Sequence, residues 1–352
     1  MRRERVVVAM SGGVDSSVAA ALVAESGAEA FGVTLKLKES APTGFGCCGS
    51  PEDLSDAKRV CETLGISHYV VDMADVFERD VVDLFVKEYA AFRTPNPCVE
   101  CNRSVKFGAL LRLAEAWKAD AVATGHYAKV ERGASGWVMR RAADEAKDQT
   151  YFLHSLTQAE LSRARFPLGG LTKPEVRARA RALGLATAEK PESQEICFVP
   201  GGDYRAFVKE RAPEAFVPGP VRTADGRTLG RHAGLASYTL GQRKGLGVAA
   251  GRPLYVTGHD AGDNALLVGD VAEAGRTTLT LERVSWTDAA PEAGSSCLVR
   301  ARHRGRLTPA RLVPLDGGRW RAELAEPVHA PAPGQAAVLY CDDVVLGGGT
   351  IS

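Results

Sequence analysis

The segment Ser11–Ser17, SGGVDSS, has the residue types of an anion-binding loop. It ends an apolar run and begins an alanine-rich one, so that a strand end, a glycine turn and a helix start follow one another. This order places unpaired backbone N–H groups at the positive end of a helix dipole, and Gly12 and Gly13 let a ligand approach the backbone closely. The loop lacks the lysine of the usual phosphate loop, GxxxxGK[ST]. A plain glycine turn with capping serines is the alternative.

Asp15 within this loop would repel a phosphate unless a Mg²⁺ ion bridged the two. The loop therefore favours a nucleotide bound with Mg²⁺, and Asp15 is the candidate metal ligand. Ligands of open parallel sheets bind outside the carboxyl ends of the strands. The adenosine is therefore expected across neighbouring strand ends, with Leu35, Gly125 and His126 as candidates. A histidine after a strand can also be an ordinary loop residue.

Three of the eight cysteines are the main candidates for chemistry. Cys98 and Cys101 form a C-x-x-C in AFRTPNPCVECN, and Cys197 lies in KPESQEICFVPGGDY. A C-x-x-C alone is ambiguous between zinc, redox and iron–sulfur chemistry, and a structural zinc site needs four ligands. A disulfide framework is not expected in a large cytosolic chain. Cys61, Cys297 and Cys341 fit buried small hydrophobic positions, whereas chemistry and accident both remain open for Cys47 and Cys48 in a glycine-rich loop.

The composition limits the kind of protein. The 352 residues, 45% hydrophobic and 25% charged, are typical of a globular protein with two or three domains. The longest apolar runs fall short of the ~18 residues that span a bilayer, so no membrane segment is expected and the cytoplasm is the default location. The formal net charge of +1 provides no global field for nucleic acid. Residues 300–321 are locally basic, with seven arginines against Asp316, which is also typical of a solvated face.

The elements that must position these residues alternate over the first two hundred positions. Strand and helix patterns follow in turn, which predicts a parallel sheet covered by helices on both faces. Glu39–Ser50 and Ala91–Asn102 are expected to be long loops, and long loops in compact domains are usually functional or mobile. Strands are expected at Arg5–Met10, Ala28–Leu37, His68–Val71 and Ala121–Thr124, and helices at Val14–Glu25, Pro51–Leu64, Val76–Ala90 and Arg103–Trp117.

The remainder of the chain is expected to be rich in β-structure. Evenly spaced short strands from Val217 onward are typical of small barrels or sandwiches. The predicted fold class is α/β: an N-terminal parallel-sheet adenine-nucleotide domain, Rossmann-like with a PP-loop, followed by two small β-rich domains. A hairpin is expected at Lys129–Arg132 and Trp137–Arg141, helices at Lys173–Leu183 and Asp203–Arg211, and the domain limits at 1–205, 206–278 and 279–352.

The chain resembles the tRNA-specific 2-thiouridylases of the MnmA type. The segments SGGVDSS, GCCG, TPNPCVECN, KF, ATGHYA, KDQTYFL and SQEICF occur in the order found in that family, from Ser11 to Phe198, and the β-rich remainder is also similar. Other ATP pyrophosphatases share only the first loop. The resemblance implies that ATP and Mg²⁺ are used to adenylate the 2-oxygen of the wobble uridine of a tRNA. A sulfur carried as a cysteine persulfide then displaces AMP and leaves 2-thiouridine.

The resemblance also implies roles for individual residues. Cys101 is implied as the nucleophile and Cys197 as the carrier of the persulfide, and the two can afterwards close a disulfide that is later reduced. A cysteine desulfurase or a persulfide relay protein is implied as the sulfur donor, and the arginines of residues 300–321 as phosphate contacts. The implied ATP contacts are Ala9, Met10, Ser11, Gly12, Gly13, Val14, Asp15, Ser16, Leu35 and Gly125. The implied contacts to the tRNA or its target base are Asn96, Pro97, Cys98, His126, Lys147, Asp148, Gln149, Arg302, His303 and Gln335.

Cys98 departs from the family pattern, because many members carry an aspartate there that is taken to act on the target base. The C-x-x-C opens a second route, in which Cys98, Cys101 and Cys197 hold three irons of a [4Fe–4S] cluster whose fourth iron binds sulfide. The persulfide route is favoured, with Arg103 and Lys106 expected to help form the thiolate. Two wider alternatives are another ATP-dependent adenylating enzyme and a non-catalytic RNA-binding module that retained a nucleotide site.

Overall fold

The computed structural model describes residues 2–37, 50–191, 196–248 and 250–352. Cys47, Cys48 and most of the expected loop Glu39–Ser50 lie outside these ranges. The first sheet has five parallel strands in the order β3-β2-β1-β4-β7. The order reverses between β1 and β4, and such a switch point is where open parallel sheets bind ligands. These strands are β1 (Arg5–Ala9), β2 (Glu29–Lys36), β3 (Ser67–Asp72), β4 (Ala121–Ala123) and β7 (Ala164–Arg165).

Helices cover both faces of this sheet because β1 is apolar on both sides. Val6 and Val8 pack in one cluster with residues of α1, α2 and α9, while Val7 packs in a second cluster with residues of the helices on the other face. The α/β class and the order of the first predicted elements are confirmed, with small shifts at the element ends. The helices of the first face are α1 (Val14–Glu25), α2 (Pro51–Leu64) and α9 (Lys173–Ala182).

Two long helical stretches line the second face, and each contains a π-helical segment. The second stretch begins at Pro97 and not at Arg103, so the predicted loop is shorter and both cysteines of the C-x-x-C are helical. The side chain of Asn96 accepts a hydrogen bond from the Cys98 N–H at 3.2 Å and caps the helix, and proline suits its first position. The stretches are α3 (Ala74–Phe77), η1 (Glu78–Val82) and α4 (Asp83–Ala90), then α5 (Pro97–Glu100), η2 (Cys101–Phe107) and α6 (Gly108–Ala116).

The C-terminal strands close into a barrel, because β12 pairs with β15 on one side and with β17 on the other. The hairpin β5–β6 from the first half of the chain joins this sheet through β17, where Val344 pairs with Arg140. The sequence pattern did not predict β17, because glycines interrupt it; a Cβ at Gly347 would collide with the Ser285 carbonyl oxygen of β12. The strands are β5 (Lys129–Arg132), β6 (Trp137–Arg140), β12 (Gly275–Trp286), β13 (Ser296–Arg300), β14 (Thr308–Pro314), β15 (Trp320–His329), β16 (Ala336–Cys341) and β17 (Val344–Ile351).

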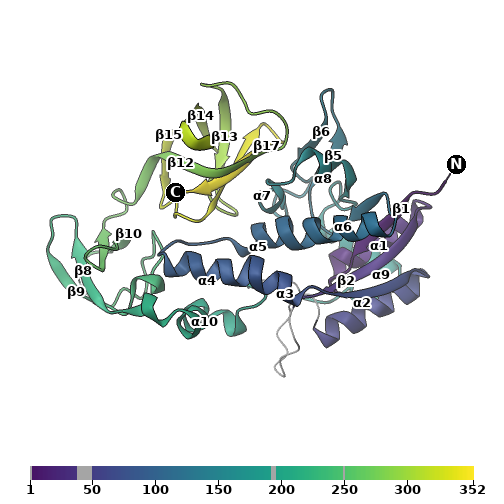
Figure 1. Ribbon diagram of the computed structural model, residues 1–352, viewed down its shortest axis with the longest axis horizontal. Coiled ribbons are helices and arrows are strands. Elements are labelled where there is room, and N and C mark those ends of the chain that lie inside the picture. The colour runs from purple at the N-terminus through teal and green to yellow at the C-terminus, as the bar shows by residue number, and fades with distance from the viewer. Residues whose placement is uncertain (1, 38–49, 192–195, 249) are drawn as a thin grey trace.

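A smaller sheet, in the order β10-β11-β8-β9, forms a third unit, and the predicted domain limits around it remain a proposal. Figure 1 shows the parallel sheet at one end of the molecule, β8 and β9 at the other, and the barrel above the long helix α4. In the described ranges no helix has the length and apolarity to span a membrane. The remaining elements are β8 (Gly219–Thr223), β9 (Thr228–His232), β10 (Tyr255–Asp260), β11 (Ala265–Gly269), α7 (Thr150–Leu153), α8 (Gln158–Arg163), α10 (Tyr204–Arg211), η3 (Pro200–Gly202), η4 (Pro213–Phe216), η5 (Leu235–Ser237) and η6 (Asp316–Gly318).

Candidate active site

The loop after β1 has the predicted strand–turn–helix geometry. Gly13 is the N-cap residue of α1, and no side chain caps the helix there. Ser11 and Ser16 hold the turn, with their hydroxyl oxygens 3.1 Å apart and the Ser16 hydroxyl donating to the Gly13 carbonyl oxygen at 2.9 Å. Gly12 has a φ of +72°, and a Cβ there would lie 2.5 Å from the Asp53 carbonyl oxygen. The open N–H groups of α1 therefore face the switch-point crevice, as an anion site requires.

The predicted nucleotide contacts on the other strands lie around this loop. A Cβ on Gly125, just after β4, would lie 2.7 Å from the backbone nitrogen of Ser16, so glycine allows β4 to end against the start of α1. Met10 donates its N–H to the Val33 carbonyl oxygen at 2.8 Å, which joins the loop to β2. Leu35 lies near the carboxyl end of that strand and is buried. The cradle therefore spans β2, β1 and β4.

Asp15 is paired with a lysine that the sequence interpretation missed. Lys173 Nζ lies 2.7 and 2.8 Å from the two carboxylate oxygens of Asp15, and Tyr127 donates its hydroxyl to the same carboxylate at 2.8 Å. Lys173 is the first residue of α9 and its side chain is 10% exposed. The loop itself lacks a lysine, but the fold supplies one from α9. No local sequence signal distinguishes Lys173 from an ordinary helix-start residue.

A second lysine lies close behind the loop. Lys190 Nζ contacts Asp53 at 2.7 Å and Asp56 at 2.6 Å, both on α2, and the backbone of Asp53 packs against Gly12. Burial acts to lower the pKa of Lys190, but its hydrogen bonds to the two carboxylates outweigh burial and raise that pKa. Lys190 therefore stays charged and ties the segment that leads toward Cys197 to the helix beside the nucleotide cradle.

The three candidate cysteines differ in accessibility. Cys98 and Cys197 are exposed, Cys101 is buried, and all described cysteines are free thiols, so the implied disulfide is not formed here. Desolvation by the surrounding protein raises the pKa of the Cys98 thiol. The positive charge of Lys106 opposes this rise, and the Cys197 thiol adds to it. Among the other cysteines, Cys61 and Cys297 are buried as predicted, whereas Cys341 is exposed at the end of β16 and its prediction was wrong.

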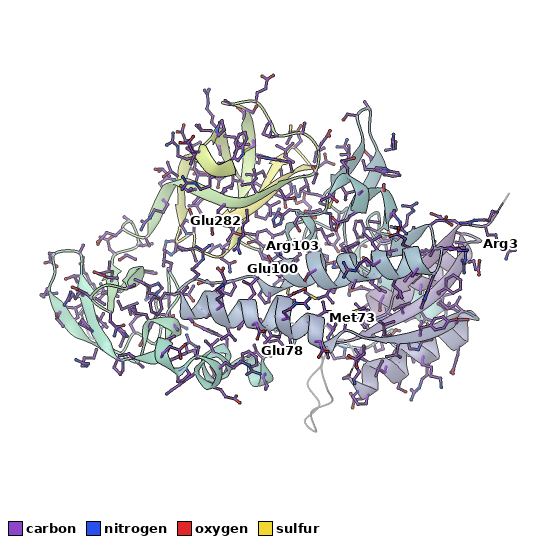
Figure 2. The ribbon with its side chains drawn as sticks, viewed as in Figure 1. Arg3, Met73, Glu78, Glu100, Arg103 and Glu282 are labelled. Carbon is purple, nitrogen blue, oxygen red and sulfur yellow. The ribbon has the colours of Figure 1, made fainter. Side chains whose placement is uncertain are left out.

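The two cations expected beside the C-x-x-C behave differently. Arg103 pairs with Glu100 at 2.5 Å, on the part of the helix that lies below Glu282 of the barrel (Figure 2). Lys106 acts electrostatically on Cys98 and also on His126, where it adds to the effect of burial and lowers the histidine pKa well below its usual value. Lys106 therefore acts on both the Cys98 thiol and the His126 imidazole.

His126 is buried after β4 as a neutral ring. Its Nδ1 lies 2.7 Å from the Thr124 hydroxyl, and Phe107 and Phe166 contact it with centroids 6.2 Å away. Because His126 follows Gly125 directly and shares Lys106 with Cys98, it connects the nucleotide cradle to the cysteine site.

Buried histidines predict loss of stability in mild acid. Burial lowers the pKa of His126 and of five other histidines, so the unfolded state binds more protons below the usual histidine pKa. The unfolding free energy is expected to fall as the pH drops below the usual histidine pKa of about 6.5, because protons then bind the unfolded state preferentially. Urea titrations across this range test it; His126→Gln should flatten the dependence, and an unchanged curve would contradict the assignment. The six are His68, His126, His154, His232, His259 and His303.

The side chains available to bind Mg²⁺ differ from those available to bind a [4Fe–4S] cluster. Mg²⁺ in nucleotide sites is held by one or two carboxylates and the phosphates, and the Asp15 side chain is 32% exposed, so its carboxylate fits that role. For a cluster, no three His, Cys, Asp or Glu side chains of the described ranges group as metal ligands. The described side chains therefore do not fit a [4Fe–4S] cluster, and no step below passes through one.

In the predicted tRNA segment Lys147–Gln149, Asp148 is buried, whereas Lys147 and Gln149 are half-buried. Gln149 accepts a hydrogen bond from the Tyr127 N–H at 2.9 Å. The Asp148 side chain is fully buried and accepts bonds from Thr150 at 2.9 Å and from Arg300 of the barrel at 2.9 Å. Asp148 therefore connects the parallel-sheet unit to the barrel, whatever else this segment contacts.

Two of the predicted contacts in the barrel lie at its junction with the cysteine helix. Gln335 donates to the Thr94 carbonyl oxygen at 2.8 Å, in the short segment that leads to Asn96. His303 stacks on Phe152 at 4.5 Å, and Arg302 beside it is exposed. The roles of these residues in binding RNA stay predictions.

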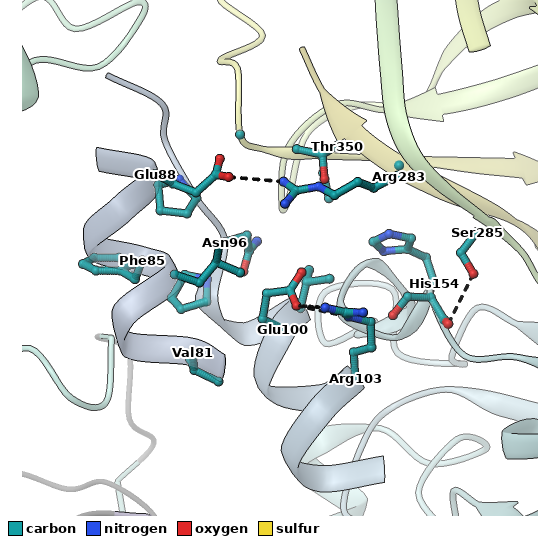
Figure 3. A pocket seen from close by; sticks show the side chains of 18 of the residues that line it. Val81, Phe85, Glu88, Asn96, Glu100, Arg103, His154, Arg283, Ser285 and Thr350 are labelled. Atoms are coloured by element: carbon teal, nitrogen blue, oxygen red, sulfur yellow. Dashed lines mark hydrogen bonds and ion pairs between the residues drawn. The ribbon is translucent and has the colours of Figure 1, made fainter. Parts of the chain in front are cut away.

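A cavity of about 420 Å³ lies between α4, α5 and the barrel. Asn96 and Pro97 line it, but neither cysteine of the C-x-x-C does. In Figure 3, Arg283 of β12 reaches across the cavity to Glu88 of α4, at 3.5 Å. The cavity is therefore on the other side of the cysteine helix from the thiols.

Solved structures share the fold only distantly. A 4-thiouridine synthetase–RNA complex with bound ATP is 18% identical, with 60% of this chain and 51% of that chain covered and a TM-score of 0.36. NMN synthetase from Francisella tularensis is 19% identical over 54% of this chain and 66% of that chain, with a TM-score of 0.34. Both TM-scores are too low to support an inference.

The sequence matches three family models along its length. They are described as a tRNA methyl transferase HUP domain, residues 4–201, a tRNA methyl transferase PRC-barrel domain, residues 205–270, and an aminomethyltransferase beta-barrel domain, residues 276–351. Relatives named tRNA-specific 2-thiouridylase MnmA occur in Chloroflexus aurantiacus, 50% identical over 99% of this chain and 98% of that protein, and in Geobacter metallireducens, 47% identical over 99% and 97%. With such similarity over the whole length, this chain belongs to the MnmA family of tRNA-specific 2-thiouridylases.

Proposed function

We propose that this protein converts the wobble uridine of a tRNA to 2-thiouridine, with ATP as the activating substrate. The observation that supports the proposal is that Gly125 packs against the start of α1, and His126 directly after it contacts Phe107 of η2, in the helical stretch that carries the C-x-x-C. A reaction that joins adenylation to sulfur transfer requires nucleotide-binding groups and thiols near one another.

In the first step the uridine O2 attacks the α-phosphorus of ATP. A bond forms between O2 and the α-phosphorus, the bond to the β-phosphate oxygen breaks, and pyrophosphate leaves. The N–H groups of α1 and Lys173 are placed to bind the developing negative charge of the phosphates. Mg²⁺, held with ATP beside Asp15, would supply further neutralisation of that charge. Adenylation converts a poor leaving group into AMP.

In the second step the terminal sulfur of a Cys197 persulfide attacks C2 of the base, and AMP leaves with O2. The Cys101 thiolate then attacks the Cys197 sulfur, forming a Cys101–Cys197 disulfide and leaving the outer sulfur on C2. A thiol reductant later supplies the two electrons that reopen the disulfide. Exposed Cys197 suits loading by a donor protein such as a cysteine desulfurase or a persulfide relay.

Cys98 stands where many relatives carry an aspartate, and its environment favours a protonated group. Because crowding raises the pKa of its thiol, Cys98 is uncharged at neutral pH and can donate a proton to the base or to a departing oxygen. His126, also neutral, can form a hydrogen bond to the base without adding charge.

The direct test supplies unmodified tRNA transcript, ATP, Mg²⁺ and a persulfide donor, and digests the RNA to nucleosides. The expected result is 2-thiouridine at the wobble position, with AMP and pyrophosphate released. AMP formation on tRNA without any sulfur in the product would favour a different adenylating enzyme. RNA binding without AMP would favour a non-catalytic module.

A further inference from the structure

The unit built on the smaller sheet, residues 219–269, carries a basic surface outside the site described above. Residues 226–259 contain five Arg or Lys residues and no Asp or Glu. Three of the five, Arg243, Lys244 and Arg252, are exposed on the loop between η5 and β10. None of the three forms an ion pair with a residue that the structure describes. Their charges are therefore uncompensated by the protein around them.

The loop is held firmly although its charges are exposed. The Gln242 side chain donates to the Lys244 carbonyl oxygen at 2.9 Å, and the Gly241 N–H donates to the Val256 carbonyl oxygen at 2.8 Å. Leu246 and Leu254 are buried in the core of the small sheet. The basic side chains therefore extend from a fixed backbone, which lowers the entropy cost of binding an anion.

A surface hollow of about 450 Å³ lies along this loop, and both Arg243 and Arg252 line it. Gly245 and Gly247 are also among its lining residues, so no side chain keeps a ligand from the backbone there. Gly230 of β9 packs against Val248, where a Cβ would lie 2.9 Å from the valine methyl group. This contact brings β9, with its exposed Arg231, next to the loop.

The arginine-rich stretch of the barrel differs in this respect. Arg300 is committed to buried Asp148, Arg306 pairs with Glu326 at 3.1 Å, and Arg321 pairs with Glu323 at 2.9 Å. Three of the arginines that were predicted to contact phosphates thus form ion pairs with carboxylates of the protein itself. The loop at Arg243–Arg252 is therefore a further candidate for an external polyanion, beside the exposed Arg302, Arg304, Arg311 and Arg319 of the barrel.

We propose that the loop segments 242–248 and 250–254 bind phosphate groups of the tRNA backbone. The proposal rests on the proposed function, because it takes tRNA as the substrate. Several separate cations around an open hollow suit successive phosphates of a chain passing over the surface. Contacts of this kind position an RNA without reading its sequence, so the loop should hold the tRNA body while the cysteine site acts on the base.

The test measures tRNA binding to the full-length protein as a function of salt. Each phosphate contact contributes about 0.7–0.9 to the slope of log K against log salt, so removal of one contact weakens binding about six-fold near 0.1 M salt. The double variant Arg243→Gln/Arg252→Gln is expected to bind unmodified tRNA about 40-fold more weakly, with the slope reduced by about 1.6. Filter binding between 50 and 200 mM KCl gives both quantities.

Arg222→Gln is the matched control, since Arg222 lies on β8 of the same sheet but pairs with Asp263 at 2.6 Å. It should leave the slope at the wild-type value. A double variant with the wild-type slope, and normal thermal unfolding, would overturn the loop assignment. Wild-type protein that does not bind tRNA would instead overturn the proposed function, so the two failures are distinguishable. Binding of a fluorescent ATP analogue should be equal in all three proteins.

Discussion

Cys197→Ser is expected to abolish formation of 2-thiouridine while tRNA-dependent release of AMP remains measurable. A serine hydroxyl cannot carry a persulfide sulfur, so the product should fall by about a thousandfold or more, as for loss of other covalent nucleophiles. Adenylation should continue, because the loop after β1 and its lysines are intact. Mass spectrometry of digested tRNA and chromatography of AMP measure the two steps in one reaction with a persulfide donor.

Cys341→Ser is the matched control, because Cys341 is also an exposed thiol but lies at the end of a barrel strand. It should support the wild-type rate of thiolation. Loss of both AMP and thiouridine in Cys197→Ser would contradict the assigned role, since it would mean that the cysteine supports the nucleotide step. Retention of thiolation would remove Cys197 from the mechanism.

Asp15→Ala is expected to lower Mg²⁺-dependent turnover of ATP on tRNA by about two to three orders of magnitude, the size seen when one charge-stabilising group is lost. The carboxylate aligns Lys173 and Tyr127 at the phosphate loop, so its removal affects both the cation and the metal. Asp15→Asn keeps the shape of the side chain and should show the same loss, which separates the missing charge from a packing defect. Pyrophosphate release measures the effect.

Asp72→Ala removes a carboxylate of the same sheet that pairs with Lys36 at 3.1 Å on the exposed edge, and it should leave turnover unchanged. Circular dichroism of all three variants shows whether they fold. Unchanged ATP turnover in folded Asp15→Ala would contradict the placement of the nucleotide at this loop.

The sequence was most informative where local patterns decide the structure. The apolar run, glycine turn and small-residue helix at Val14–Glu25 agree with the observed helix at both ends. The prediction of a loop over Ala91–Asn102 is wrong at its C-terminal end, because Asn96 and Pro97 form a regular helix start that a proline-containing stretch does not reveal by itself. The strand at Val344–Ile351 was missed because its glycines are required by a close crossing that only the closed barrel creates.

The candidate site was predictable as motifs but not as an assembly. The loop and the cysteines carry their own signals, whereas the Lys173–Asp15 pair joins residues 158 positions apart and depends on how α9 packs beside α1. The ion pairs Lys190–Asp53 and Asp148–Arg300 also join residues that are far apart in the sequence. Asp148 is predicted to contact RNA, but its carboxylate forms a buried ion pair between the parallel-sheet unit and the barrel. Periodicity reports which residues are buried, but it does not report which charges meet.

The central claim is that two thiols and an activated base exchange sulfur without a metal cluster, and a single-turnover reaction tests it most directly. Iron-free protein loaded with a persulfide on Cys197 is mixed with ATP, Mg²⁺ and unmodified tRNA in the absence of air. The account predicts one 2-thiouridine, one AMP and one disulfide between Cys101 and Cys197 for each loaded chain. Thiouridine that forms only when the protein carries iron, with both cysteines still reduced at the end, would contradict it.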